Sequence, residues 1–96
     1  AAVPRLPGAL EAAREGFLSA GLKNNREFVG DCVSFKGRVP QEYRDLLFDP
    51  QTSGGLLISV SPDAAKGALT ALKARGVVAA RIGRVVKQRG ALLLVR

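Results

Sequence analysis

The stretch Asp49-Pro50-Gln51-Thr52-Ser53-Gly54-Gly55-Leu56-Leu57-Ile58 leads from a proline into paired glycines and then into an apolar run. Pro50 ends the preceding helix, because the residue before a proline is pushed out of the helical region of backbone space. The apolar run over residues 55–60 is typical of a strand that is buried on both faces. The stretch therefore predicts a helix, a turn and a buried strand in direct succession.

Outward from this stretch, apolar spacing and turn residues predict further helices and strands on both sides. The clearest helix starts with Ser61 as N-cap and Pro62 at its first position, and Gly76 follows its last turn. A buried strand, a helix and another strand indicate a crossover unit, so we expect an α/β (α+β) fold with helices packed on a single sheet. The expected elements are a helix at 7–17, a turn at 23–26, a strand at 28–35 with Phe28 and Phe35 in the core, a helix at 41–48, a strand at 55–60, a helix at 62–75, and strands at 77–86 and 91–95 joined by a hairpin turn at 87–90.

Length and composition limit the class of protein. The 96 residues, 47% of them hydrophobic, are enough for one small domain or part of a larger one, and we expect residues 1–96 to form a single domain. No apolar run approaches the roughly 20 residues that span a membrane, and no signal peptide is visible. One cysteine and no histidine exclude a disulfide framework and a Cys/His zinc site within one chain. These features favour a cytoplasmic protein without a membrane partner.

The positive charge lies in the second half of the chain. The net charge is +7, and residues 51–96 contain eight Lys or Arg against Asp63 alone. Such asymmetry is compatible with an anionic partner, but without a dense basic cluster, scattered solvated side chains are the favoured explanation. Strand alternation would place Arg81 and Arg84 on opposite faces, and no aromatic residue follows Gly55 for base stacking. A small basic RNA-binding module is therefore the less favoured alternative.

The residues with most chemical potential are Thr52, Ser53, Gly54 and Gly55. Glycines let successive backbone N–H groups converge on an anion, and the two hydroxyls can add donors, so the segment is a candidate phosphate-facing loop. From the residues alone, an ordinary tight turn is the favoured interpretation. It is not a Walker loop, because no Gly-Lys-Ser/Thr follows.

Two other residues invite a catalytic or metal-binding interpretation. Asp49 is a weak candidate magnesium ligand, because one carboxylate beside a proline is more often a turn or helix-end residue. Cys32 has no histidine to activate it, so we interpret it as a small core or edge residue of the strand rather than a nucleophile. We therefore assign no catalytic residue within this chain.

The stretch from Asp49 to Ile58 resembles the motif near the end of bacterial selenophosphate synthetases (selenide, water dikinases). The similarity extends over essentially all of the chain, with one departure: the family commonly has Gly-Gly-Thr where this chain has Ala20-Gly21-Leu22. The further matching segments are Val3-Pro4-Arg5-Leu6-Pro7-Gly8-Ala9, Asn25-Arg26-Glu27-Phe28 and Ile82-Gly83-Arg84-Val85.

The resemblance implies the fold of the aminoimidazole ribotide synthetase superfamily, in which an N-terminal ATP-binding domain precedes a C-terminal α/β domain. Residues 1–96 would be the later part of the C-terminal domain, and the N-terminal domain would be absent. The implied reaction converts selenide, ATP and water, with magnesium, into selenophosphate, AMP and phosphate. Selenophosphate is the selenium donor for selenocysteine and for selenium-modified tRNA.

The family's catalytic cysteine or selenocysteine, its paired lysine and its metal-binding aspartates belong to motifs that do not occur in this chain. The resemblance therefore implies that the chain alone is inactive and holds no cofactor. Its implied partners are the N-terminal ATP-binding domain and a second copy in a full-length homodimer. A thiamine-phosphate kinase, a hydrogenase-maturation protein or a purely structural domain are the other possibilities.

Overall fold

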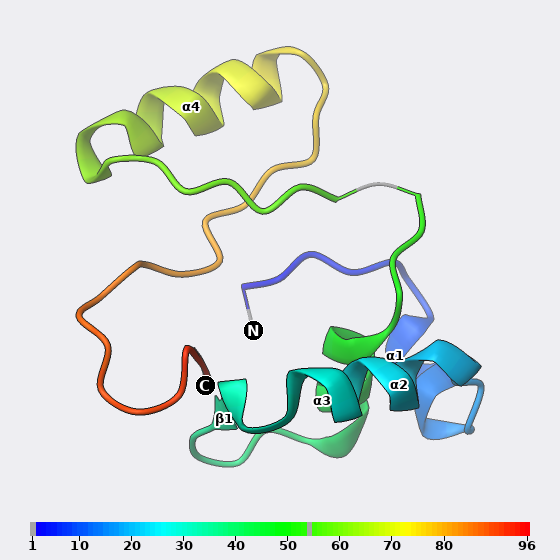
Figure 1. Ribbon diagram of the computed structural model, residues 1–96. Helices are drawn as coiled ribbons and strands as arrows, with labels where there is room; N and C mark the ends of the chain where they lie inside the picture. The colour runs from blue at the N-terminus through cyan, green and yellow to red at the C-terminus, as the bar shows by residue number, and fades with distance from the viewer. Residues whose placement is uncertain (1, 54) are drawn as a thin grey trace. The chain divides into compact units, whose positions relative to one another are not determined.

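A computed structural model describes residues 2–53 and 55–96, and they divide into two compact units. One unit, here called the helical unit, contains residues 6–53 and 87–96; the other, here called the α4 unit, contains residues 2–5 and 55–86. Short helices together with a small parallel sheet make the chain α+β, as predicted. The elements are α1 Ala9–Arg14, α2 Ala20–Val29, the 3-10 helix η1 Gly30–Cys32, β1 Val33–Phe35, α3 Gln41–Phe48, α4 Pro62–Ala74 and β2 Leu93–Val95 (Figure 1).

Helix α1 is shorter than the predicted helix over 7–17, because a glycine ends it. Gly16 has a φ of +86°, in the left-handed region that favours glycine. Its N–H donates to the carbonyl of Ala13 at 3.2 Å, and the N–H of Phe17 donates to that of Ala12 at 3.0 Å. This pair of bonds is a Schellman motif, which satisfies carbonyls that the helix end leaves unpaired.

Helix α2 corrects two predictions at once. The polar segment 23–26, expected to be a turn, lies inside α2, and the predicted strand over 28–35 begins only at Val33. Phe28 is 93% exposed on this helix and is not a core residue. Lys23 and Asn24 are exposed on this helix, whereas Leu22 is buried. The other two polar residues of the segment, Asn25 and Arg26, bond to α3.

The sheet of the helical unit pairs two short strands in parallel. Val33 lies opposite Leu93 and Phe35 opposite Val95, and the N–H of Lys36 donates to the carbonyl of Val95 at 2.8 Å. The predicted hairpin of strands 77–86 and 91–95 is therefore wrong. The last strand, β2, pairs with β1, which lies about 60 residues earlier in the chain. Turn residues indicate pairing between neighbouring strands only, so they could not predict this one.

Helix α3 has the bounds that the sequence predicts, and it lies at the centre of the helical unit. It packs against both α1 and α2. The rings of Phe48 on α3 and Phe35 on β1 meet edge to face, with 6.1 Å between their centroids. The apolar core around it is small and consists of Leu10, Ala13 and Leu22.

In the α4 unit, the predicted helix is confirmed. The Ser61 hydroxyl accepts from the N–H of Ala64, Pro62 occupies the first helical position, and Gly76, with a φ of +74°, follows the last turn. Among the helices of the described residues, none is long and apolar enough to cross a membrane.

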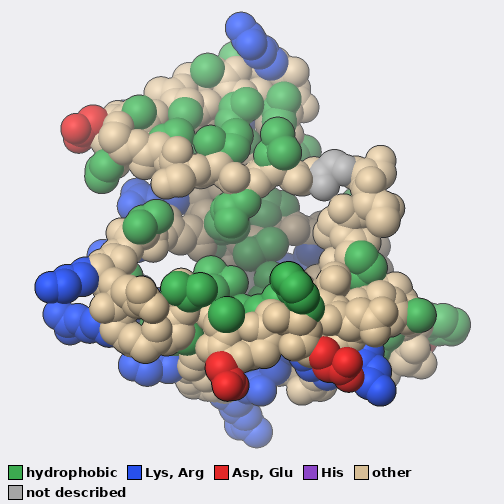
Figure 2. Space-filling view, in the orientation of Figure 1, with side chains coloured by type: hydrophobic (Ala, Val, Ile, Leu, Met, Phe, Trp, Pro, Cys, Tyr) green, Lys and Arg blue, Asp and Glu red, His purple; other side chains and the backbone are tan. Residues whose placement is uncertain are grey.

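The predicted strands at 55–60 and 77–86 are not present in the described part of the chain. A strand requires a neighbouring backbone to satisfy its N–H and C=O groups, and neither run has a paired partner there. Leu56 and Leu57 are 90% and 81% exposed, and Figure 2 shows hydrophobic side chains open on the surface of this unit. The crossover unit expected around α4 is therefore not formed.

We expect acid to weaken the helical unit through Glu42. The Arg14 Nε donates to the Glu42 Oε1 at 2.9 Å, which joins α1 to α3. The backbone amide of Glu42 and the Arg14 side chain hold the pKa of this carboxyl below its ordinary 4.5. Because the pKa is lower in the folded state, the stabilisation is complete above the unfolded pKa and is lost as the pH falls through the folded pKa.

Thermal unfolding of Glu42→Gln measures this contribution. The midpoint should drop at neutral pH and should approach that of the parent chain in acid. Glu27→Gln is the matched control, because its pair with Lys23 is exposed and 3.9 Å long, and it should change the midpoint less. An identical pH profile for the parent chain and Glu42→Gln would contradict the assignment.

Candidate functional site

The stretch from Asp49 to Ile58 follows directly from the end of α3. Asp49 has an extended backbone, with φ −63° and ψ 131°, and it terminates the helix one residue before Pro50, as predicted. Thr52 and Ser53 follow as exposed residues of the helical unit. Gly55 belongs to the α4 unit and has a φ of +76°, whereas Gly54 lies outside the described residues.

The Asp49 carboxylate is occupied by two protein donors. The Ser19 Oγ donates to its Oδ1 at 2.6 Å, and the Gln51 Nε2 donates to its Oδ2 at 2.9 Å. Within the described residues, no group of three acidic, cysteine or histidine side chains could hold a metal ion. The surroundings of Asp49 therefore fit an anchor for the loop better than they fit a magnesium ligand.

Helix α2 contacts the beginning of the loop at two further points. The Asn25 Nδ2 donates to the carbonyl of Phe48 at 2.9 Å, and this carbonyl belongs to the last turn of α3. Gly21 faces the Pro50 ring so closely that a Cβ at position 21 would lie 2.9 Å from the Pro50 Cγ. Residues 20–22 depart from the Gly-Gly-Thr pattern of the family at positions 20 and 22. Gly21, which contacts Pro50, is the residue that matches the pattern.

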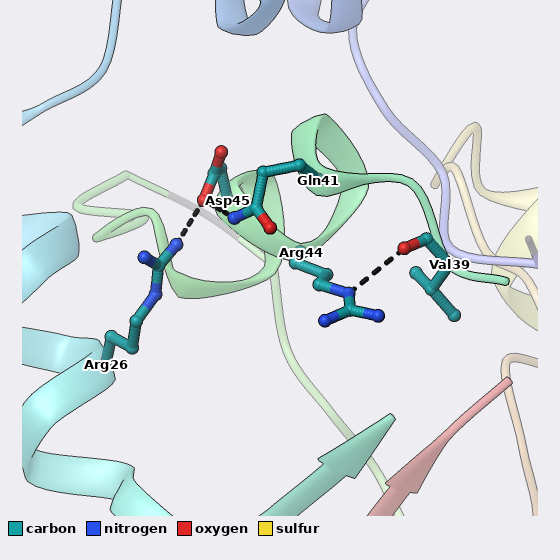
Figure 3. Close-up of polar contacts among 5 residues, drawn as sticks. All are labelled: Arg26, Val39, Gln41, Arg44 and Asp45. Atoms are coloured by element: carbon teal, nitrogen blue, oxygen red, sulfur yellow. Dashed lines mark hydrogen bonds and ion pairs between the residues drawn. The ribbon is translucent and has the colours of Figure 1, made fainter. Parts of the chain in front are cut away.

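A buried carboxylate links α2 to α3. Asp45 is 7% exposed and accepts from Arg26, with which it forms an ion pair, and from the Gln41 Nε2 at 2.8 Å. Figure 3 shows Arg26 and Gln41 converging on this carboxylate, while Arg44 points to the carbonyl of Val39. Arg26 also lies over the Phe48 ring, 5.5 Å from its centroid.

Other predicted candidates lie apart from this arrangement. Cys32 is exposed in η1, which corrects its expected place inside a strand, and the end of α2 at Gly30 is the reason. Of the basic residues expected on the hairpin, Arg81 and Arg84 belong to the α4 unit, and Lys87 and Arg89 belong to the helical unit.

Sequence reasoning named the loop but missed Ser19 and Asn25, which hold its beginning, and Asp45, which joins α2 to α3. One signal was available for the first of these. Ser19 precedes Leu22 and Val29, which are spaced for one face of a helix, and a serine just before such spacing is a helix-start signal.

Comparison with known proteins gives a consistent result. Residues 8–95 match the family described as AIR synthase related protein, C-terminal domain. The chain is 52% identical over 87 residues to a selenide, water dikinase from Pelobacter propionicus and 48% identical to one from Agathobacter rectalis, with 90% and 91% of the chain covered. A selenide, water dikinase from Escherichia coli is 39% identical over 98% of the chain.

The chain spans about a quarter of the length of these curated relatives, 25% for the first two and 26% for the third. Each relative therefore has a further part, about three times as long, that this chain does not match.

The close approach of α2 to the loop predicts opposite effects for alanine at two helical glycines. Gly67→Ala in α4 meets nothing within 4 Å and should stabilise the chain by about 0.5–1 kcal/mol, because glycine is a poor helix former. Gly21→Ala gains the same propensity but crowds Pro50, and overpacking costs about 1–3 kcal/mol, so we expect net destabilisation.

Denaturant unfolding of the two variants provides the test, since both changes add one methyl group to a helix. Stabilisation by Gly21→Ala as large as that by Gly67→Ala would show that α2 does not press on Pro50.

Proposed function

The chain belongs to the AIR synthase related protein, C-terminal domain family, and we propose that it forms the C-terminal part of a selenide, water dikinase. One observation carries this proposal: relatives with that name match almost the whole chain with only about a quarter of their own length. They lend no support to a thiamine-phosphate kinase, a hydrogenase-maturation protein or an RNA-binding module. The complete protein would then make selenophosphate from selenide, ATP and water and release AMP and phosphate.

Thr52, Ser53, Gly54 and Gly55 are the proposed phosphate-facing residues. The hydroxyls of Thr52 and Ser53 are exposed, and within the described residues neither has a hydrogen-bond partner. Both can therefore donate to a phosphate oxygen without breaking an existing bond, and hydrogen bonds to a charged acceptor are the stronger kind. The positive φ of Gly55 favours a backbone that turns its N–H toward an anion.

The contribution proposed for this chain is binding and shielding. A loop that covers the phosphates of ATP excludes water from them, which protects a reactive phosphorylated intermediate from hydrolysis. The remaining part of the enzyme, with an N-terminal ATP-binding domain, would supply the nucleophile and the magnesium ligands. We propose that the complete protein works in the cytoplasm as a homodimer.

Removing both hydroxyls should impair the complete enzyme. We expect Thr52→Ala combined with Ser53→Ala to lower kcat/KM for ATP by about ten- to a hundredfold, because one or two charge-assisted hydrogen bonds are lost. Steady-state, selenide-dependent AMP formation is the measurement. Thr70→Ala is the matched control, since its exposed hydroxyl donates only to the carbonyl of Lys66 within α4.

The same assay applied to the 96-residue chain alone should detect no ATP turnover. A direct binding measurement on this chain should likewise detect no tight binding of ATP. Turnover by the purified chain would overturn its proposed role as a non-catalytic part. Unchanged kinetics of the double variant would show that the hydroxyls of Thr52 and Ser53 do not bind phosphate.

A further inference from the structure

We propose that helix α2 positions the loop, and that Ser19, Gly21 and Asn25 are positioning residues for Thr52 and Ser53. Here these three residues are called the α2 clamp. The catalytic significance of the clamp rests on the proposed function, but its effect on the loop does not. Neither the family match nor the names of the relatives assign a role to these side chains.

Ser19 supplies the first part of the argument, because it does not cap its own helix. A serine at the N-cap ordinarily accepts a hydrogen bond from a backbone N–H in the first turn. Ser19 occupies the N-cap of α2 without such a bond. Its hydroxyl instead donates to Asp49, 30 residues later in the chain, at 2.6 Å. A short bond of this kind to a carboxylate is stronger than one between neutral groups.

Asp49 transmits this contact into the loop. Its second oxygen accepts from the Gln51 Nε2 at 2.9 Å, so one carboxylate bridges Ser19 and the residue immediately before Thr52. Asparagine at this position could not accept from both donors, because one of its two oxygens is replaced by a donor group. The negative charge of Asp49 is thus used to hold the backbone.

Gly21 and Asn25 hold the residues on either side of Asp49. Asn25 donates to the carbonyl of Phe48, and Gly21 leaves room for the Pro50 ring. The clamp therefore contacts residues 48, 49 and 50 in succession and stops where the exposed hydroxyls begin. A rigid base below free donors is the arrangement that pre-organises a ligand-binding loop.

A double-mutant cycle in the complete enzyme tests the clamp. Ser19→Ala and Asp49→Asn should each lower kcat/KM for ATP by about tenfold, and the double variant should be little worse than either one. Ser19→Thr retains the hydroxyl and should recover most of the activity. Ser34→Ala, an exposed serine on β1, is the matched control and should behave as the parent.

NMR relaxation gives a readout without substrate. In the two single variants, the backbone order parameters of residues 51–53 should fall below those of the parent, while those of α4 should be unchanged. Should the parent enzyme lack selenide-dependent turnover, the proposed function fails, and the order parameters still decide whether the clamp exists.

Unchanged order parameters at residues 51–53 in both variants would overturn the clamp. Strictly multiplicative kinetic losses in the double variant would also overturn it, since Ser19 and Asp49 would then act independently. Recovery of Asp49→Asn by added Mg²⁺ would instead make Asp49 a metal ligand and would equally contradict the proposal.

Discussion

The helical unit depends on a single buried charge, the Asp45 carboxylate. A charge that leaves water must be paired and hydrogen-bonded, and Asp45 is the one charged side chain buried in the part of the chain that the structure describes. Arg26 on α2 and Gln41 on α3 satisfy it. With an apolar core of only a few aliphatic side chains, this polar junction fixes how the two helices meet.

The position of the loop follows from that junction. Arg26 pairs with Asp45 and also lies over Phe48, so the end of α3 is held from the side of α2. The contacts of Asn25 and Ser19 then continue along the same helix to Phe48 and Asp49. The motif that resembles selenophosphate synthetases is therefore more than a turn after a helix: its first half is held by α2, and its second half contains the groups that we propose for phosphate binding.

The elements that the sequence predicts well are those with local signals. Helix α3 is bounded by prolines, and α4 has a serine cap, an early proline and a terminal glycine. The polar segment inside α2 is predicted wrongly, because its residue types are typical of a turn. In the structure the segment is helical, and Arg26 within it forms an ion pair with Asp45 on α3. The parallel pairing of β1 with β2 joins distant segments, which no local pattern encodes. The chemistry of Thr52 and Ser53 makes them predictable as candidates. The residues that hold the loop could not be predicted in the same way, because they belong to α2, whose helical structure the sequence did not indicate.

The most direct test of this account is the free energy of unfolding of Asp45→Asn, measured together with the backbone order parameters of the loop. The substitution keeps the shape and removes the charge, so we predict a loss of about 1–3 kcal/mol and lower order parameters at residues 51–53. Asp31→Asn, on an exposed side chain of η1, should cause neither change. A free energy of unfolding and loop order parameters equal to those of Asp31→Asn would contradict the account.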